Sequence, residues 1–431
     1  MAESPKTDNH SLAQYAAAVG IDWADQKHDI SLVELGGREQ AVAHCVIGST
    51  PQALTAWVCS LQQRFGGNKI AVAVEQKRGP LIHFLSAFDF IDIYPVPTAA
   101  LKKLREALYP SGRKSDKNDS HLALDLLTKH MDCLRLMKPE SAEIRELAAL
   151  CEDRRHLVDE RTGKLQALRD ACKGYFPLIV ELFDFKSPVL CRFLLRWDTL
   201  EKLQKAKPAI LRKFFHANRC RGDVIERRLT AIKDAEALTK DPGVINPLRR
   251  RVEVLCKQII ALFEAIAPYE MRIRELFEAL PSAAVFKSLP GAGEAMAPRL
   301  AAALGEDRSK FHSASDLQNY SGTSPVTKRS GQSQHQVLFR WAAPTFMRQS
   351  FVEWANHSRR RSRWAGAYYA LCLERGDRHN TALRKLAWKW QRILFRLWTT
   401  GQPYDEDAYL RSLAKHGSPI IAKIAPLEDA A

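Results

Sequence analysis

The first 130 residues alternate short apolar runs with segments that have helical spacing. Four runs rich in β-branched residues predict strands, at 18–22, 30–35, 69–75 and 91–97. Amphipathic segments between and after them predict helices, at 50–65, 79–88, 101–108 and 121–130. Thr50 stands before Pro51 as a plausible N-cap of the first helix. Strands that alternate with helices predict a layered α/β domain.

From about residue 140 the spacing changes to alternating steps of three and four. One seam contains two arginines and runs through Ile144, Leu147, Cys151, Arg154, Val158, Arg161, Leu165, Leu168 and Cys172. A second, apolar seam runs through Leu248, Val252, Leu255, Ile259, Leu262 and Ile266. Two long helices with this pattern fit an antiparallel hairpin or an intermolecular coiled coil. Residues 176–246 between them are helical in character, and the region reads either as a spacer or as a dimer arm that also contacts nucleic acid.

These patterns divide the chain into four parts. We expect an acidic α/β domain over 1–135, a helical coiled-coil region over 136–280, and a mostly helical, tryptophan-rich domain over 281–410. A tail follows at 411–431. The fold class is therefore α/β plus all-α.

The net charge of +16 is distributed unevenly. Residues 1–130 hold 14 Lys+Arg and 14 Asp+Glu, whereas the remainder holds 51 and 35. A neutral first domain before a basic remainder favours a polyanionic partner such as nucleic acid. A solvated basic surface and a membrane-surface role are the other interpretations of the same charge.

The apolar runs and cysteines indicate where the protein works. No apolar run approaches the ~20 residues that span a bilayer, and the N-terminus lacks the apolar core of a signal peptide, so we expect a cytoplasmic protein with no membrane partner. The nine cysteines form no C-x-x-C pair, which argues against a zinc ribbon and for reduced thiols.

Four acidic residues in the first domain are candidate metal ligands. Asp22 and Glu75 each end a predicted strand, and Asp116 and Asp119 face the same side if the segment between them opens a helix. Converging carboxylates hold Mg²⁺, and a pair of such ions can clamp both oxygens of a phosphodiester displacement. Taken singly, each acid has an ordinary interpretation as a turn, solvent-facing or helix-capping residue, and Asp116 in particular could be an N-cap.

Three basic or glycine-rich segments in the last domain are candidate nucleic-acid contacts. The sequence L-P-G-A-G at 289–293 resembles a helix-hairpin-helix turn, in which Gly291 and Gly293 would let backbone N–H groups face a phosphate. The second is Lys328-Arg329, beside Ser330-Gly331, and the third is the run Arg359, Arg360 and Arg361. A Pro-Gly turn before a helix is also common without any ligand.

Several of these motifs together resemble those of the DEDD transposases of bacterial insertion sequences. The matching segments are V-G-I-D-W-A at 19–24, A-V-E ending at Glu75, S-D-K-N-D-S-H-L-A at 115–123, and the stretch from Asp316 to Ser333. The resemblance implies an RNase H-like first domain similar to the Holliday-junction resolvase RuvC, a domain also shared with Piv-type DNA invertases. It makes Asp22, Glu75, Asp116 and Asp119 catalytic metal ligands and places a nucleophilic serine on Ser330. Ser333 is the nearest competitor, Ser321 and Ser324 lie further away, and His335 alone does not make a dyad.

The resemblance also implies an activity and a set of partners. It implies a DNA recombinase that cuts and rejoins strands through a phosphoserine intermediate, with two Mg²⁺ ions as cofactors. Donor and target DNA, a structured noncoding guide RNA (a bridge RNA), and a homodimer or homotetramer in the bacterial nucleoid follow from the same resemblance. Two alternatives stay open: a Holliday-junction-type metal-dependent endonuclease that uses water, and a non-catalytic nucleic-acid-binding scaffold.

Overall fold

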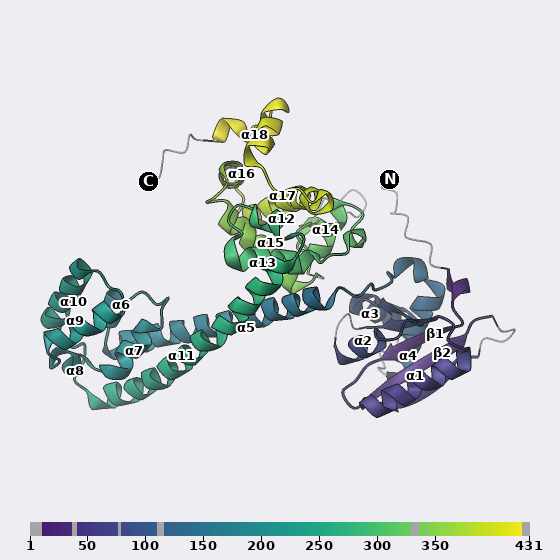
Figure 1. Ribbon diagram of the computed structural model, residues 1–431, viewed down its shortest axis with the longest axis horizontal. Coiled ribbons are helices and arrows are strands. Elements are labelled where there is room, and N and C mark those ends of the chain that lie inside the picture. Colours follow the sequence, from purple (N-terminus) through teal and green to yellow (C-terminus); the bar gives the residue numbers. More distant parts are fainter. Residues whose placement is uncertain are drawn as a thin grey trace. The chain divides into compact units, whose positions relative to one another are not determined.

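The computed structural model describes residues 11–36, 41–75, 79–109, 116–328, 336–341 and 343–424 (Figure 1). The chain divides into two compact units, Met1–Glu140 and Ser141–Ala431. Among the described residues, no helix combines the length and the apolar character needed to cross a bilayer.

The first unit is built on a five-stranded sheet in the order β3-β2-β1-β4-β5. The strands are β1 (Ala17–Asp22), β2 (Lys27–Glu34), β3 (Ala43–Gly48), β4 (Ile70–Val74) and β5 (Ile91–Pro95). β1, β2 and β3 form an antiparallel meander, and β4 and β5 add to β1 in parallel. The four predicted strands are confirmed, and β3 is an addition that the sequence analysis did not predict.

Helices cover both faces of this sheet. They are α1 (Pro51–Phe65) and α2 (Pro80–Leu85) on one face, and α3 (Thr98–Leu108) and α4 (Asp116–Lys129) on the other. Alternation along the strands explains the difference between the faces. Large residues such as Val19, Val72 and Val74 point toward α1 and α2, whereas Ala18, Ala71 and Ala73 leave room for α4. Thr50 accepts a hydrogen bond from the Ala53 N–H, which confirms it as the N-cap of α1.

The second unit begins with two long antiparallel helices, α5 (Ala142–Tyr175) and α11 (Pro242–Ala279). Ion pairs from Arg272 to Glu146 and from Arg154 to Glu270 set their antiparallel direction within one chain. The two arginines in the α5 seam are accommodated, because Arg154 pairs with Glu270 and Arg161 lies 4.4 Å from the ring centre of Phe263. The seams therefore pair with each other as a helical hairpin.

The two halves of this hairpin belong to different cores. One half packs with the short helices α6 (Leu178–Leu182), α7 (Val189–Arg196), α8 (Leu200–Gln204), α9 (Pro208–Ala217) and α10 (Gly222–Asp234). The other half packs into a C-terminal helical bundle around Trp354, Trp364, Trp390 and Trp398. The bundle holds α12 (Ala283–Lys287), α13 (Gly293–Leu304), α14 (Ala314–Ser321), α15 (Thr345–Ser358), α16 (Arg363–Glu374) and α17 (His379–Thr400). A last helix, α18 (Glu406–Lys415), rests on it through Tyr409 and Leu410.

Candidate active site

Asp22 and Glu75 lie at one edge of the sheet in the first unit. Asp22 is the last residue of β1, Glu75 follows the last residue of β4, and the two strands are parallel neighbours in which Ile21 is paired with Val74. Because side chains alternate along a strand, Asp22 shares the face of Ala18, and Glu75 shares the face of Ala71 and Ala73. Both acids therefore belong to the face that α4 covers.

Gly20 fixes how close α4 comes to that edge. A Cβ atom at Gly20 would lie 2.1 Å from the carbonyl oxygen of Ser120 and 2.5 Å from the Leu124 nitrogen, so the helix backbone packs directly on β1. The Ser120 hydroxyl also lies 2.8 Å from the Ser31 hydroxyl. Ser31 on β2 is the residue opposite Gly20 in the antiparallel pairing of β1 with β2. Ser120 is one position after Asp119, and Gly20 is two positions before Asp22. The first turn of α4 is thereby anchored beside the acidic edge.

The two acids of α4 have different surroundings. Both lie in the helix, because Asp116 is its first residue and Asp119 is in its first turn. Asp116 is exposed, whereas Asp119 is 5% exposed. One carboxylate oxygen of Asp119 accepts a hydrogen bond of 2.7 Å from Nε of Arg105 on α3 and forms an ion pair with Nη2 of the same residue, also at 2.7 Å. Asp119 is thus held in place by a guanidinium, and any metal ion bound there would have to share this carboxylate.

The structure adds Asp29 to this edge, a residue that the sequence analysis did not select. Asp29 on β2 is paired with Asp22 on β1, is 6% exposed, and lies on the same face as Ser31. Its Oδ1 atom is 3.0 Å from Nε2 of His44 on β3. The signal was present in the alternation of β2, where the polar Asp29 and Ser31 alternate with the apolar Ile30 and Leu32 and occupy the α4 side.

The turn after Asp22 is held by His28. The ring of His28 stacks on Trp23 at 6.3 Å between centroids, and Nδ1 accepts a hydrogen bond of 3.4 Å from the Ala24 N–H. Burial lowers the pKa of His28 below its usual value, which keeps the ring neutral and Nδ1 free to accept. Deeper in the same domain, burial raises the pKa of Tyr15 and Tyr94, whose hydroxyls are 2.7 Å apart.

The carboxylates of Asp22, Asp29, Glu75, Asp116 and Asp119 do not converge on one point as metal ligands would. Within the described ranges, no group of three or more His, Cys, Asp and Glu side chains is arranged to hold a metal ion. The donor chemistry nevertheless suits Mg²⁺, since the edge offers carboxylate oxygens from two strands and a helix.

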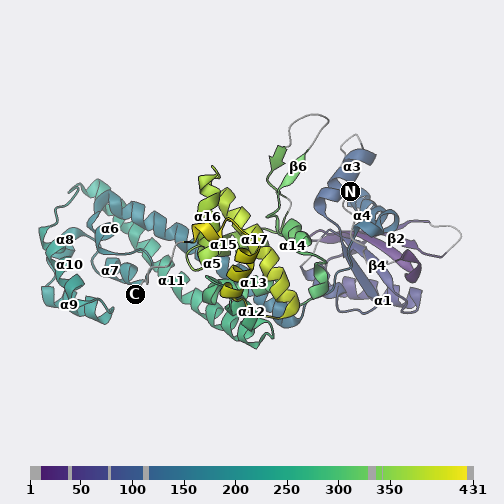
Figure 2. The same ribbon diagram turned by 90° about the horizontal axis from the view of Figure 1, so that it is seen from above.

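The serine motif belongs to the second unit. Ser330, its neighbour Arg329 and the competitor Ser333 lie outside the described residues, in the segment 329–335 between β6 (Val326–Lys328) and β7 (Gln336–Leu338). The two strands form an antiparallel hairpin that projects from the bundle (Figure 2). Lys328 is the last residue of β6. Ser321 is fully buried, and its hydroxyl accepts a hydrogen bond of 2.7 Å from Nε2 of Gln391.

The two glycines of the L-P-G-A-G segment have different roles in the structure. Gly291 has φ +73°, and a Cβ there would lie 2.8 Å from the carbonyl carbon of His357 and the nitrogen of Ser358, so close packing on α15 requires a glycine. Gly293 has φ +53°, is exposed and begins α13. The indole nitrogen of Trp354 donates to the Pro290 carbonyl oxygen at 3.1 Å and anchors the turn.

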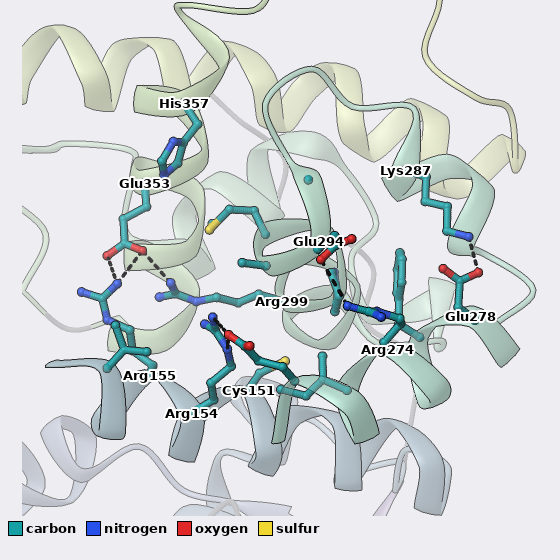
Figure 3. A pocket seen from close by; sticks show the side chains of 18 residues that line it. Cys151, Arg154, Arg155, Arg274, Glu278, Lys287, Glu294, Arg299, Glu353 and His357 are labelled. Carbon is teal, nitrogen blue, oxygen red and sulfur yellow. Dashed lines mark hydrogen bonds and ion pairs between the residues drawn. The ribbon is translucent and has the colours of Figure 1, made fainter. Parts of the chain in front are cut away.

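Gly293 borders a charged cavity of about 570 Å³ between α5, α11, α13 and α15 (Figure 3). Glu353 on α15 lines one side of the cavity, where it lies 3.0 Å from a guanidinium nitrogen of Arg155 and 2.6 Å from one of Arg299. Further pairs join Arg154 to Glu270 and Arg274 to Glu294. Because the cations here face carboxylates, the cavity is an ion-pair network between helices rather than a bare basic pocket.

The arginine run follows α15 directly. Arg359 donates from Nε to the Asn356 side chain at 2.8 Å, and its guanidinium lies 4.8 Å from the ring centre of Tyr369. Arg360 and Arg361 are exposed. The run therefore offers two solvent-facing cations and one that packs on the bundle.

Comparison with known proteins finds similarity to transposases. Residues 19–177 match a DEDD family profile described as a transposase, and residues 283–370 match a profile described as the transposase IS116/IS110/IS902 family. The IS117 mini-circle protein of Streptomyces coelicolor, whose name marks it as a candidate transposase, is 25% identical over 90% of this chain and 95% of its own length. An IS116 protein of Streptomyces clavuligerus is 24% identical over 90% of this chain and 98% of its own length.

The proteins that this chain resembles are transposases and other proteins of bacterial insertion elements. More particularly, the chain is similar to the DEDD transposases of the IS110/IS116 group, since the two profiles match in order and the similarity extends along nearly the whole chain.

Proposed function

We propose that this protein is a transposase that cuts and rejoins DNA with a metal-assisted acidic site formed by Asp22, Glu75, Asp116 and Asp119. The observation that carries the proposal is the placement of Asp22 and Glu75 at the ends of adjacent parallel strands, on the face where α4 packs. The sheet order supports an RNase H-like fold for this domain. When bound, Mg²⁺ supplies positive charge that stabilises the phosphate as one oxygen attacks and another leaves.

Ser330 is the proposed nucleophile. Its oxygen would form a new phosphoester bond and give up its proton while one bond from phosphorus to a deoxyribose oxygen breaks, and the leaving oxygen takes up a proton to become a hydroxyl. The energy of the broken bond is kept in the phosphoserine and is used for rejoining. Lys328, Arg329 and the exposed Arg360 and Arg361 would offset phosphate charge, together with Arg359 and the N–H groups near Gly291 and Gly293.

The proposal extends to partners. The second unit carries the whole net charge of +16, because residues 1–140 are neutral, and this basic unit suits donor and target DNA and a noncoding bridge RNA. The proposed protein is a homodimer or homotetramer that acts at the nucleoid. The α5–α11 hairpin would serve as the coiled-coil arm through which the copies associate.

Substitution of Glu75 tests the acidic site. Glu75→Gln keeps the shape of the side chain but removes its charge, so Mg²⁺-dependent cleavage of DNA carrying the element ends should fall at least about 100-fold, since even outer-shell partners of metal sites matter 10- to 100-fold. Asp125→Asn is a matched control, because Asp125 lies on α4 but pairs with Lys129. Full cleavage by the Glu75 variant, with Mg²⁺ as the sole divalent ion, would refute the assignment.

A further inference from the structure

An exposed aromatic surface follows the serine segment and has no role in the function proposed so far. Trp341 is 81% exposed, whereas Trp354, Trp364, Trp390 and Trp398 are buried in the bundle. Leu338, which ends β7, is 40% exposed. Exposed apolar side chains that lie next to one another, with polar residues around them, are typical of interaction sites.

Arginines surround the aromatic side chains. The ring of Phe339 meets the edge of Trp341 at 4.9 Å between centroids and 77° between planes. The guanidinium of Arg348 on α15 lies 4.9 Å from the centre of the Phe339 ring, and that of Arg384 on α17 lies 5.0 Å from it. We name these residues, with Arg340, the Trp341 platform.

The platform is held by hydrogen bonds to the bundle. Nη1 of Arg348 donates to the carbonyl oxygens of Arg340 at 3.1 Å and Trp341 at 3.4 Å, which fixes the backbone under the indole. Arg340 donates from Nε to the Ser324 carbonyl at 3.3 Å and from Nη2 to the Asn319 side chain at 3.2 Å.

Among the described residues, no neighbouring carboxylate offsets the charges of the platform. The hydrogen-bond partners of Arg340, Arg348 and Arg384 are carbonyl, amide and hydroxyl oxygens. In the part of the chain that the structure describes, no carboxylate forms an ion pair with them, in contrast to the cavity around Glu353. An exposed aromatic ring beside uncompensated guanidiniums is complementary to an unpaired base and its phosphate.

We propose that the Trp341 platform stacks an unpaired base of the DNA strand that Ser330 attacks. The inference rests on the proposed function, because Trp341 comes eleven positions after the proposed nucleophile and the platform begins where β7 ends. Stacking would hold a strand out of the duplex, and the arginines would bind its phosphates. The strand would then be presented to the serine segment in single-stranded form.

Binding of the full-length protein to a single-stranded DNA oligonucleotide tests this proposal. Trp341→Ala should weaken the affinity about 5- to 100-fold, the range found when a stacking aromatic is removed, and Trp341→Phe should retain most of it. Affinity for a blunt duplex of the same sequence should change much less. Leu238→Ala is the control, because Leu238 is a 62% exposed apolar residue elsewhere in the second unit.

A spectroscopic readout separates stacking from a structural effect. Stacking on a base should quench the emission of the exposed indole, and Trp341→Phe should lose this quenching while it still binds. Arg384→Gln should lower the slope of log affinity against log salt by about 0.7, the contribution of one phosphate contact on a single strand.

Several results would overturn the inference. They are unchanged single-strand affinity in Trp341→Ala, an equal loss for duplex, a preference for RNA of the same sequence, or a change in self-association without a change in DNA binding. If the parent protein cleaves DNA in a Glu75-dependent way while Trp341→Ala binds normally, only the platform fails. A parent that neither binds nor cleaves DNA overturns the proposed function as well.

Discussion

Individual side chains at the acidic edge are partnered in ways that their sequence positions do not reveal. Asp119 is held by Arg105, fourteen positions earlier and on another helix. Asp29 on β2 pairs with His44 on the neighbouring strand β3. The four acids could be selected from the sequence because each ends a strand or opens a helix. The partners of these acids could not be predicted from the sequence, because the pairs form only when α3, α4 and the sheet pack together.

A comparable long-range pair holds the second unit together and gives a stability prediction. Glu353 bridges Arg155 and Arg299, and the Arg299 side chain is only 7% exposed. Glu353→Gln would leave a buried guanidinium without its counter-charge, so the free energy of unfolding should fall by about 3 kcal/mol in urea titrations.

Glu294→Gln provides the comparison for this prediction. Glu294 pairs with Arg274 at 3.3 Å on the rim of the same cavity, and its side chain is 88% exposed. Its loss should cost less than about 1 kcal/mol. Equal effects of the two substitutions would contradict the view that Glu353 neutralises a buried arginine.

At the scale of elements, apolar periodicity predicted the sheet and the long helices because each follows from spacing along one segment. Large residues alternate with Ala and Gly in β1 and β4, so the sequence already contained the face on which α4 packs. The β3 strand was missed because its six residues carry no continuous alternation and are half-buried or exposed. The α5 and α11 seams predicted two helices, but their pairing within one chain required the structure.

The close packing of α4 on β1 can be tested at Gly20. Gly20→Ala would place a Cβ 2.1 Å from the Ser120 carbonyl oxygen, so α4 must move away from the strand end that carries Asp22. Overpacking of this kind costs about 1–3 kcal/mol. We expect faster hydrogen exchange of the α4 amides by mass spectrometry and reduced DNA cleavage.

Gly48→Ala in β3 is the matched control for this substitution. Its nearest neighbour would be the Ala53 Cβ at 3.7 Å, an ordinary contact. It should leave the exchange of α4 unchanged. If Gly20→Ala exchanges and cleaves like the parent, α4 does not position the acids by close packing.

For the whole molecule, charge and chemistry are divided between the two units. The acids lie in the neutral unit, and the serine motif, the arginine run and the Trp341 platform lie in the basic one. The division of charge was predicted from the sequence, because it follows from counting the basic and acidic residues in each part of the chain. The platform was not predicted, because Phe339 and Trp341 are separated in the sequence from Arg384 and an exposed tryptophan looks like a buried one in a sequence.

The proposed reaction needs both the acids of the first unit and Ser330 of the second, and detection of a covalent protein–DNA adduct tests it most directly. The full-length protein, with co-purifying nucleic acid and Mg²⁺, is incubated with labelled DNA that carries the element ends, and adducts are resolved on a denaturing gel and mapped by mass spectrometry. We predict DNA attached to Ser330, lost in Ser330→Ala and in Glu75→Gln but retained in Ser333→Ala. An adduct that survives Ser330→Ala would contradict the account, and so would cleavage by the parent protein without any adduct, which would make water the nucleophile.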